Sequence, residues 1–142
     1  MTEILTDLQK KLVALTRDLI LIPSDESRPE EIERCFAFII NHLESLDTVV
    51  IKKHCHRGIT SLVVLPKNMD HPKVLLCGHL DVISHSDSHC YRSHITDGKI
   101  IGPGSGDMKG PLAVLLEVFM NLHTEHDNLS LGLAITSDEE RG

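Results

Sequence analysis

Aromatic residues and basic residues are both scarce in this sequence of 142 residues. It has no Trp, and aromatic residues make up only 3% of it. A core must therefore be aliphatic, and the stacking platforms of single-stranded nucleic-acid binders are missing. Lys and Arg number 14 against 21 Asp and Glu, which gives a formal net charge of −7. Because no stretch gathers enough basic residues to bind a phosphate backbone, we expect no nucleic-acid partner.

Long apolar runs and paired cysteines are also absent from the sequence. No run approaches the roughly 18 apolar residues of a membrane span, so we expect no membrane partner. The N-terminal segment carries charges throughout and has no small-residue cleavage site, which favours an amphipathic helix over a signal peptide. The cysteines never form a C-x-x-C pair, which predicts buried, reduced thiols and a cytoplasmic location. They are Cys35, Cys55, Cys77 and Cys90.

The composition that remains is typical of a globular domain with helices and strands. Hydrophobic residues make up 41% and charged residues 25% of the chain, whose length suits one domain. Helical periodicity predicts three helices, of which the second begins with a capping box of Ser27 and Glu30. Short aliphatic or β-branched runs predict four strands that are buried on both faces of a sheet. The helices are expected over 4–22, 28–46 and 111–123, and the strands over 48–55, 59–65, 73–79 and 129–136.

The order of these elements predicts an α/β layered domain. Strand 73–79, helix 111–123 and strand 129–136 form a plausible crossover unit. The polar stretch from 84 to 98 has no clear period and is expected to be a surface loop that ends in an Asp97-Gly98 turn.

The glycine-rich stretch GPGSGDMKG at 102–110 lies just before the third predicted helix, where phosphate-binding loops are found. A Walker loop is excluded because the Gly-Lys pair of this sequence is followed by Ile100 instead of Ser or Thr. The dinucleotide fingerprint is excluded because the G-x-G-x-x pattern ends on Lys109 instead of glycine. Asp107 would also place a carboxylate where the phosphate should dock. In isolation Asp107 is either a residue stabilised by the helix N-terminus or a ligand.

The stretch CGHLDV at 77–82 ends a predicted strand with a His and an Asp two residues apart. On an extended chain His79 and Asp81 project from the same face. A carboxylate beside an imidazole is the pattern that fixes the tautomer of a metal-binding histidine. A purely structural hydrogen bond between the two residues is an equally good interpretation of this motif alone.

The stretch TSDEERG at 136–142 places three acids where the last predicted strand ends. Three consecutive acids usually form a solvated turn. In open α/β sheets, however, ligands bind at the carboxyl ends of strands, where both His79 and Glu140 fall. Adjacent glutamates point in different directions, so one can bind a metal while the other faces the water of a hydrolysis reaction.

The three motifs GHLDV, GPGSGDMKG and TSDEERG, in this order, resemble the zinc-dependent exopeptidases and deacylases. This family includes acetylornithine deacetylase, succinyl-diaminopimelate desuccinylase, aminoacylase and glutamate carboxypeptidase. The IPS after the first helix and DGKIIGPG before Asp107 extend the similarity along nearly the whole chain. The resemblance implies a three-layer α/β catalytic domain with a mixed sheet flanked by helices, of which residues 1–142 are the N-terminal portion.

The resemblance also implies a role for each motif residue. His79 would bind one metal, Asp107 would bridge two metals and Glu140 would bind the second. Glu139 would be the general base, and Asp81 would orient His79. The peptide bond between Asp107 and Met108 would be cis. The mixture of imidazole and carboxylate is consistent with two divalent ions, zinc in the first place, with cobalt or manganese also accommodated.

Family members are longer and carry two more ligands and a smaller lid or dimerisation domain. On the family pattern this chain lacks both, so each ion would keep two protein ligands instead of the three typical of catalytic zinc. We therefore expect the chain alone to bind metal weakly and to hydrolyse little. The exposed apolar sheet surface also makes association between copies, such as a homodimer, an expectation.

The predicted function is that of a metal-dependent hydrolase that cleaves an amide bond of N-acyl amino acids or small peptides. The alternative is a non-catalytic binding or scaffold fragment that retains the fold without a complete site. A competing metal site could come from ligand-type residues in the polar loop, although their spacing matches no zinc-finger pattern. These are His85, His89, Cys90 and His94.

Overall fold

The structure is a computed structural model that describes residues 5–141. Its first helix is amphipathic and begins with a complete capping box. Helix α1 spans Asp7–Ile20. The Thr6 side chain accepts a hydrogen bond from the Gln9 backbone N–H, and the Gln9 side chain accepts one from Thr6, which forms a capping box. The start predicted at Ile4 lies outside the described residues. One face of the helix is buried, and it contributes Leu15 and Leu19 to the core.

Helix α2 spans Pro29–Leu43, and the capping box predicted at its start is wrong. Its N-cap is Arg28, which makes no side-chain capping bond. The Ser27 hydroxyl instead donates a hydrogen bond of 2.5 Å to Asp25 Oδ1. Asp25 is fully buried, and its carboxylate holds the Ser27 hydroxyl away from the helix N–H groups that a capping serine would accept from. The helix also ends three residues before the predicted end at 46.

Four strands form one mixed sheet in the order β1-β2-β6-β3. Strand β1 (Val49–His56) pairs antiparallel with β2 (Ile59–Pro66), β2 pairs antiparallel with β6 (Leu131–Thr136), and β3 (Val74–His79) pairs parallel with β6. Helix α3, which spans Lys109–Glu125, connects β3 to β6. The predicted crossover unit is therefore confirmed, and the parallel register places His79 opposite Thr136 at the carboxyl ends of both strands.

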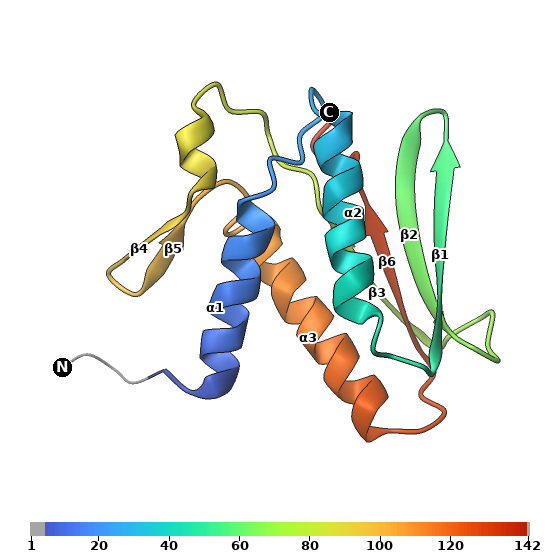
Figure 1. Cartoon of the computed structure of the whole chain (residues 1–142). Coiled ribbons are helices and arrows are strands. Elements are labelled where there is room, and N and C mark those ends of the chain that lie inside the picture. The colour runs from blue at the N-terminus through green and yellow to red at the C-terminus, as the bar shows by residue number, and fades with distance from the viewer. Residues whose placement is uncertain (1–4, 142) are drawn as a thin grey trace.

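Helices α2 and α3 pack against one face of this sheet, and α1 packs against α3 (Figure 1). Alternate residues of the two central strands enter the core, as Leu62 and Val64 do from β2 and Leu133 and Ile135 do from β6. The mixed sheet flanked by helices that the sequence predicted is confirmed. The expectation that every strand is buried on both faces is wrong for both edge strands: most residues of β1 are exposed, and Val74 and Leu75 of β3 are about half exposed. Association between copies through such residues stays a prediction.

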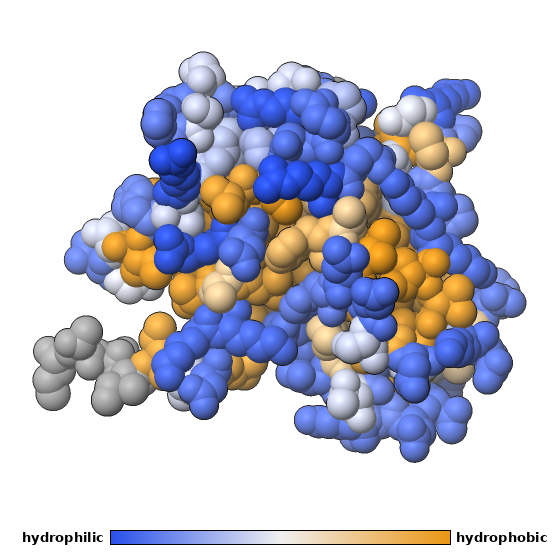
Figure 2. Space-filling view, in the orientation of Figure 1, coloured by the Kyte–Doolittle hydropathy of each residue, from blue (hydrophilic) through white to orange (hydrophobic). Residues whose placement is uncertain are grey.

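The segment between β3 and α3 contains a short 3-10 helix, Ser88–Tyr91, and a hairpin. Strands β4 (His94–Thr96) and β5 (Lys99–Ile101) form this hairpin, and both turn residues, Asp97 and Gly98, have positive φ, as a tight two-residue hairpin turn requires. The predicted turn is confirmed, whereas the two short strands were not predicted. Figure 2 shows apolar surface at this hairpin, where Ile95 and Ile101 are exposed.

The cysteines are free in the structure, as expected of reduced thiols. Only Cys35 is buried, however, so the expectation that all four are core residues is wrong. Cys55 and Cys77 are exposed because they lie on the two edge strands, β1 and β3. Within residues 5–141, no helix is long and apolar enough to cross a membrane.

Candidate metal centre

His79 is the last residue of β3 and is only 6% exposed. Its Nε2 atom lies 3.1 Å from Asp107 Oδ1 and 3.7 Å from Glu139 Oε2. Its Nδ1 atom lies 3.1 Å from the backbone oxygen of Asp81 and 3.4 Å from Asp81 Oδ1. In the imidazolium form Nδ1 donates to the acceptors of Asp81 and Nε2 donates to Asp107, and a metal ion would replace the proton on Nε2.

Asp81 is buried and joins the ends of β3 and β6. Its Oδ2 atom accepts a hydrogen bond of 2.9 Å from the backbone N–H of Glu140. Its Oδ1 atom has no hydrogen bond within normal geometry but faces His79 Nδ1 at 3.4 Å. Since the carboxylate is desolvated, the imidazole is its available partner on that side. One side chain therefore holds both His79 and the acidic turn in position.

Asp107 precedes α3 in the glycine-rich loop. The peptide bond between Asp107 and Met108 is cis, as the resemblance predicted. The Asp107 side chain is 81% exposed, in contrast to that of Asp81, which is 3% exposed. Its only hydrogen bond among the described residues is the one to His79, so most of its oxygen lone pairs face solvent.

The glycines around Asp107 allow close packing and do not form a phosphate cradle. A Cβ atom on Gly110 would lie 2.2 Å from the backbone oxygen of Ser105, a distance that no side chain tolerates. A Cβ atom on Gly104, where φ is +75°, would lie 2.8 Å from Val82. The loop can therefore fold tightly against the end of β3 only with glycine at these positions.

Glu139 and Glu140 follow β6 and complete a group of potential metal ligands. Ligand atoms of His79, Glu139 and Glu140 all lie within 4.8 Å of one another, and this is the one such group in residues 5–141. Asp107 joins the group through its 3.1 Å contact with His79. An imidazole nitrogen and several carboxylate oxygens that converge in this way form a donor set that suits divalent zinc, cobalt or manganese.

Known proteins are similar to this chain in sequence and in fold. Residues 75–142 match the profile of Peptidase family M20/M25/M40. The succinyl-diaminopimelate desuccinylase of Vesicomyosocius okutanii is 30% identical over 138 residues, which cover 92% of this chain and 35% of that protein. That of Herminiimonas arsenicoxydans is 33% identical with the same coverage. This chain is therefore similar to the M20/M25/M40 peptidase family, with the profile match in residues 75–142.

Solved structures of low sequence identity show the same fold. Human carnosine dipeptidase 1 matches with a TM-score of 0.77 and 22% identity, over 94% of this chain and 33% of that chain. The M20 family metallo-carboxypeptidase Sso-CP2 of Sulfolobus solfataricus matches with a TM-score of 0.74 and 18% identity, over 92% and 31%. The present chain spans about a third or less of the length of these curated and solved relatives.

Ser24 supports the candidate centre from the loop after α1. Its hydroxyl donates a hydrogen bond of 2.7 Å to the backbone oxygen of Leu80, and its own backbone oxygen accepts one of 3.1 Å from Val82. These two bonds flank Asp81 and fix the backbone that presents it. The sequence signalled this residue only through the IPS resemblance and gave it no role.

Lys109 follows Asp107 and Met108 in the glycine-rich loop and is fully buried. Its Nζ atom donates hydrogen bonds to the backbone oxygens of Leu19 and Ile22, at 2.9 and 2.5 Å. Burial lowers the pKa of Lys109 to about 8, although the charges of nearby groups such as Asp25 oppose this shift. The ammonium group therefore ties the residue after the cis bond to the end of α1.

The electrostatics of the centre favour a cation. Burial lowers the pKa of His79, but the hydrogen bond with Asp107 and the charges of Asp81 and Glu139 outweigh it, so the pKa lies above its usual value. Burial raises the pKa of Glu140, and the charge of Glu139 raises it further. The raised pKa of His79, and part of the raised pKa of Glu140, come from negative charges crowded around the imidazole, and a bound cation would relieve that crowding.

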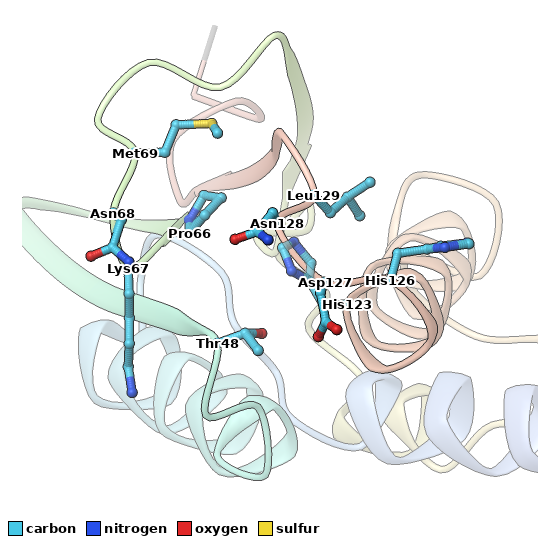
Figure 3. Close-up of a pocket in the computed structure, with 10 residues that line it drawn as sticks. All are labelled: Thr48, Pro66, Lys67, Asn68, Met69, His123, His126, Asp127, Asn128 and Leu129. Carbon is cyan, nitrogen blue, oxygen red and sulfur yellow. The ribbon is translucent and has the colours of Figure 1, made fainter.

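A cavity of about 320 Å³ opens beside the centre, and its lining includes Asp107 and Glu140. A larger cavity of about 420 Å³ lies at the opposite end of the sheet, between the start of β1, the turn after β2 and the end of α3 (Figure 3). Its lining includes His123 and His126 but none of the residues that the motifs singled out. The motif residues therefore gather at one end of the sheet.

The competing metal site predicted in the polar loop does not form. Residues 84–98 bring no three ligand-type side chains together in the part of the chain that the structure describes. His89 and Cys90 lie in the 3-10 helix, His94 begins β4, and His85 lines the cavity beside Asp107. The hairpin and the 3-10 helix thus separate residues that are close in sequence.

Proposed function

We propose that this chain supplies part of the active site of a metal-dependent hydrolase that cleaves amide bonds of N-acyl amino acids or small peptides. The convergence of His79, Asp107, Glu139 and Glu140 at the carboxyl ends of β3 and β6 is the observation that supports the proposal most. The names of its relatives agree with it, since they include desuccinylases, a dipeptidase and a metallo-carboxypeptidase.

His79, Asp107 and Glu140 would hold the metal ions, with Asp107 shared between two of them. Asp107 suits a shared position because a carboxylate offers one oxygen to each ion, and its oxygens are largely exposed. When bound, two divalent ions polarise the amide carbonyl and lower the pKa of the attacking water. Zinc is the first choice for this donor set, with cobalt or manganese as alternatives.

Glu139 would act as the general base. Its side chain is 59% exposed, and its Oε2 atom lies 3.7 Å from the Nε2 atom of His79. A carboxylate in this setting can take a proton from water and return it to the leaving amine. Asp81 would keep the proton of His79 on Nδ1, so that Nε2 stays available as a ligand atom.

On the family pattern this chain would offer each ion two protein ligands, His79 with Asp107 and Asp107 with Glu140. Catalytic zinc is usually held by three. We therefore expect the 142-residue chain by itself to bind zinc weakly and to turn over little substrate. Rapid zinc-dependent hydrolysis of N-acyl amino acids or dipeptides by this chain would contradict that expectation.

Zinc titration calorimetry on three variants tests the assignment of roles. His79→Ala should weaken zinc binding at least tenfold, because it removes a ligand. Glu139→Ala should leave zinc affinity within about twofold, because the general base is not a ligand. His126→Ala, in the distant cavity, serves as the control and should change nothing. Equal affinity of the wild type and His79→Ala would overturn the proposed function.

A further inference from the structure

The cavity of about 420 Å³ at the far end of the sheet has no part in the metal centre, and its volume is within the usual range of small-molecule pockets. One wall is the end of β2 and the turn after it, from Pro66 to Met69, together with Thr48. The other wall is the loop between α3 and β6, from His126 to Leu129, together with His123 (Figure 3). Two segments that are distant in sequence therefore border a space that suits a ligand of the size of a single amino acid.

His123 gives this cavity a buried polar group. The residue is 4% exposed, and its ring packs against Phe119, with 4.3 Å between the ring centroids. Its Nε2 atom lies 3.0 Å from the backbone oxygen of Leu131, which can only accept, so Nε2 carries a proton. In the neutral ring Nδ1 then keeps a free lone pair, and it makes no hydrogen bond within residues 5–141. A buried acceptor in a cavity wall without a protein partner favours a ligand that donates a hydrogen bond.

Two exposed charges of opposite sign lie on the two walls. Lys67 belongs to the turn after β2 and Asp127 to the loop after α3, and Figure 3 shows their side chains on different sides of the cavity. Among the described residues, neither of them forms an ion pair. The cavity therefore offers one cation and one anion whose charges are available to a ligand. A ligand that carries both charges is the complementary one.

The rest of the wall is apolar and is held in place. Pro66, Met69 and Leu129 are each partly buried. The Ser130 hydroxyl donates a hydrogen bond of 3.0 Å to the Met69 sulfur, and the Met69 backbone N–H donates one of 3.1 Å to the Pro66 oxygen. An aliphatic group placed against this wall would be stabilised by the apolar area that it removes from water.

We propose that this cavity is a second binding site, separate from the metal centre, and that its ligand is a free α-amino acid with an aliphatic side chain. The ammonium group of the ligand would donate to His123 Nδ1 and face Asp127, and its carboxylate would face Lys67. Its side chain would pack against Pro66 and Leu129. A hydrolase of N-acyl amino acids or small peptides releases molecules of this class. The inference goes beyond the proposed function, because it needs neither the metal ions nor the residues that would hold them.

Three ligands that differ by one group each test the inference on the whole chain without added zinc. L-leucine carries both charges, isocaproate lacks the ammonium group, and isoamylamine lacks the carboxylate. Chemical-shift titrations should give about tenfold tighter binding of leucine than of either analogue, which corresponds to one charge-assisted hydrogen bond. Leucine and isoamylamine should shift the Nδ1 resonance of His123, and isocaproate should not.

Two substitutions of exposed residues assign the charges, and each has a control outside the cavity. Asp127→Asn should weaken leucine binding about tenfold and leave isocaproate binding unchanged, because only leucine has an ammonium group to lose its partner. Lys67→Gln should weaken leucine binding about tenfold and leave isoamylamine binding unchanged, for the corresponding reason at the carboxylate. Asp47→Asn and Lys73→Gln remove exposed charges that do not line the cavity and should leave leucine affinity within about twofold.

Leucine that binds no more tightly than its two analogues would overturn the inference, as would equal leucine affinity of the wild type and both charge variants. Leucine-dependent shifts at His79 instead of His123 would also overturn it. Because these titrations contain no zinc, each of these results leaves the proposed function standing, which the zinc titrations test separately.

Discussion

The two aspartates that contact His79 lie in opposite settings. Asp81 touches the Nδ1 side, is buried, and also holds the turn of Glu140 through a backbone hydrogen bond. Asp107 touches the Nε2 side, and 81% of its side chain is exposed. The Asp81 side is thus organised by this chain's own fold, whereas the Asp107 side offers open oxygens to a ligand. Changes on the first side should alter stability, and changes on the second should alter metal binding.

The largest effect on stability is expected from the loop that carries Asp107. Gly110→Ala should destabilise the fold by about 3 kcal/mol or more, because the new Cβ atom would lie 2.2 Å from the Ser105 backbone oxygen, which cannot move aside like a side chain. Gly106→Ala is the matched control in the same loop, since a Cβ atom there meets nothing within 4 Å. Urea denaturation of both variants measures the difference, and equal losses would show that the loop does not pack as described.

The buried Lys109 should make stability depend on alkaline pH. Burial lowers its pKa from 10.5 to about 8 in the folded state, so between these values the unfolded chain binds more protons than the folded chain. Stability should therefore rise as pH increases from about 8 to about 10.5, by up to about 3 kcal/mol. Lys109→Met, which keeps most of the volume, should remove this rise. A pH-independent stability in the wild type over that range would contradict the burial of a charged ammonium group.

The two aspartates themselves give the most direct contrast. Asp81→Asn should cost about 2 kcal/mol of stability, because it exchanges a buried carboxylate for an amide between His79 and the Glu140 backbone. Asp107→Asn should change stability by less than about 0.5 kcal/mol, since the side chain is exposed, yet it should weaken zinc binding at least tenfold. Thermal melts and zinc titrations of both variants distinguish the two sides, and a large loss of stability in Asp107→Asn would undermine the contrast.

The smallest effect on stability is expected from Ser24, whose hydroxyl bonds the backbone next to Asp81. Ser24→Ala should cost about 1 kcal/mol through the lost bond to Leu80 and should also weaken zinc binding a few fold, because the Asp81 backbone loses one support. Ser130→Ala also loses one hydrogen bond, which the Ser130 hydroxyl accepts from the Lys73 backbone N–H at the far end of β3 and β6. It should cost similar stability without any change in zinc affinity. Identical zinc affinity for Ser24→Ala and the wild type would assign Ser24 to the fold alone.

Local sequence patterns predicted the elements of this fold well, because each of them is encoded by neighbouring residues. The alternation and length of the apolar runs gave all four strands of the main sheet, and Asp97-Gly98 gave the hairpin turn. The capping box at Ser27 failed because the carboxylate of Asp25 holds the Ser27 hydroxyl away from the helix start, and the burial that places Asp25 there depends on the packed fold. The exposure of Cys55 and Cys77 was missed for the same reason, since edge positions follow from strand order.

The candidate centre was predictable only as far as its motifs reached. The motifs place His79, Asp81, Asp107, Glu139 and Glu140 at the ends of predicted elements, the family resemblance implied their roles, and the structure brings them together. Long-range partners were not predictable, since no sequence pattern near Ser24 indicates its hydrogen bond with Leu80, and none near Lys109 indicates its hydrogen bonds at the end of α1. A metal site in the polar loop could not be decided from the sequence, because the 3-10 helix and the hairpin, which separate its histidines, were not predicted.

Observation of the His79 ring nitrogens during zinc titration tests the central claim most directly. Long-range ¹H–¹⁵N spectra of the wild-type chain resolve Nδ1 and Nε2 of each histidine. We predict that zinc shifts the Nε2 resonance of His79 first, while Nδ1 keeps its proton against Asp81. A zinc titration that leaves both His79 nitrogens unchanged, while those of His89, His94 or His126 shift, would contradict the account.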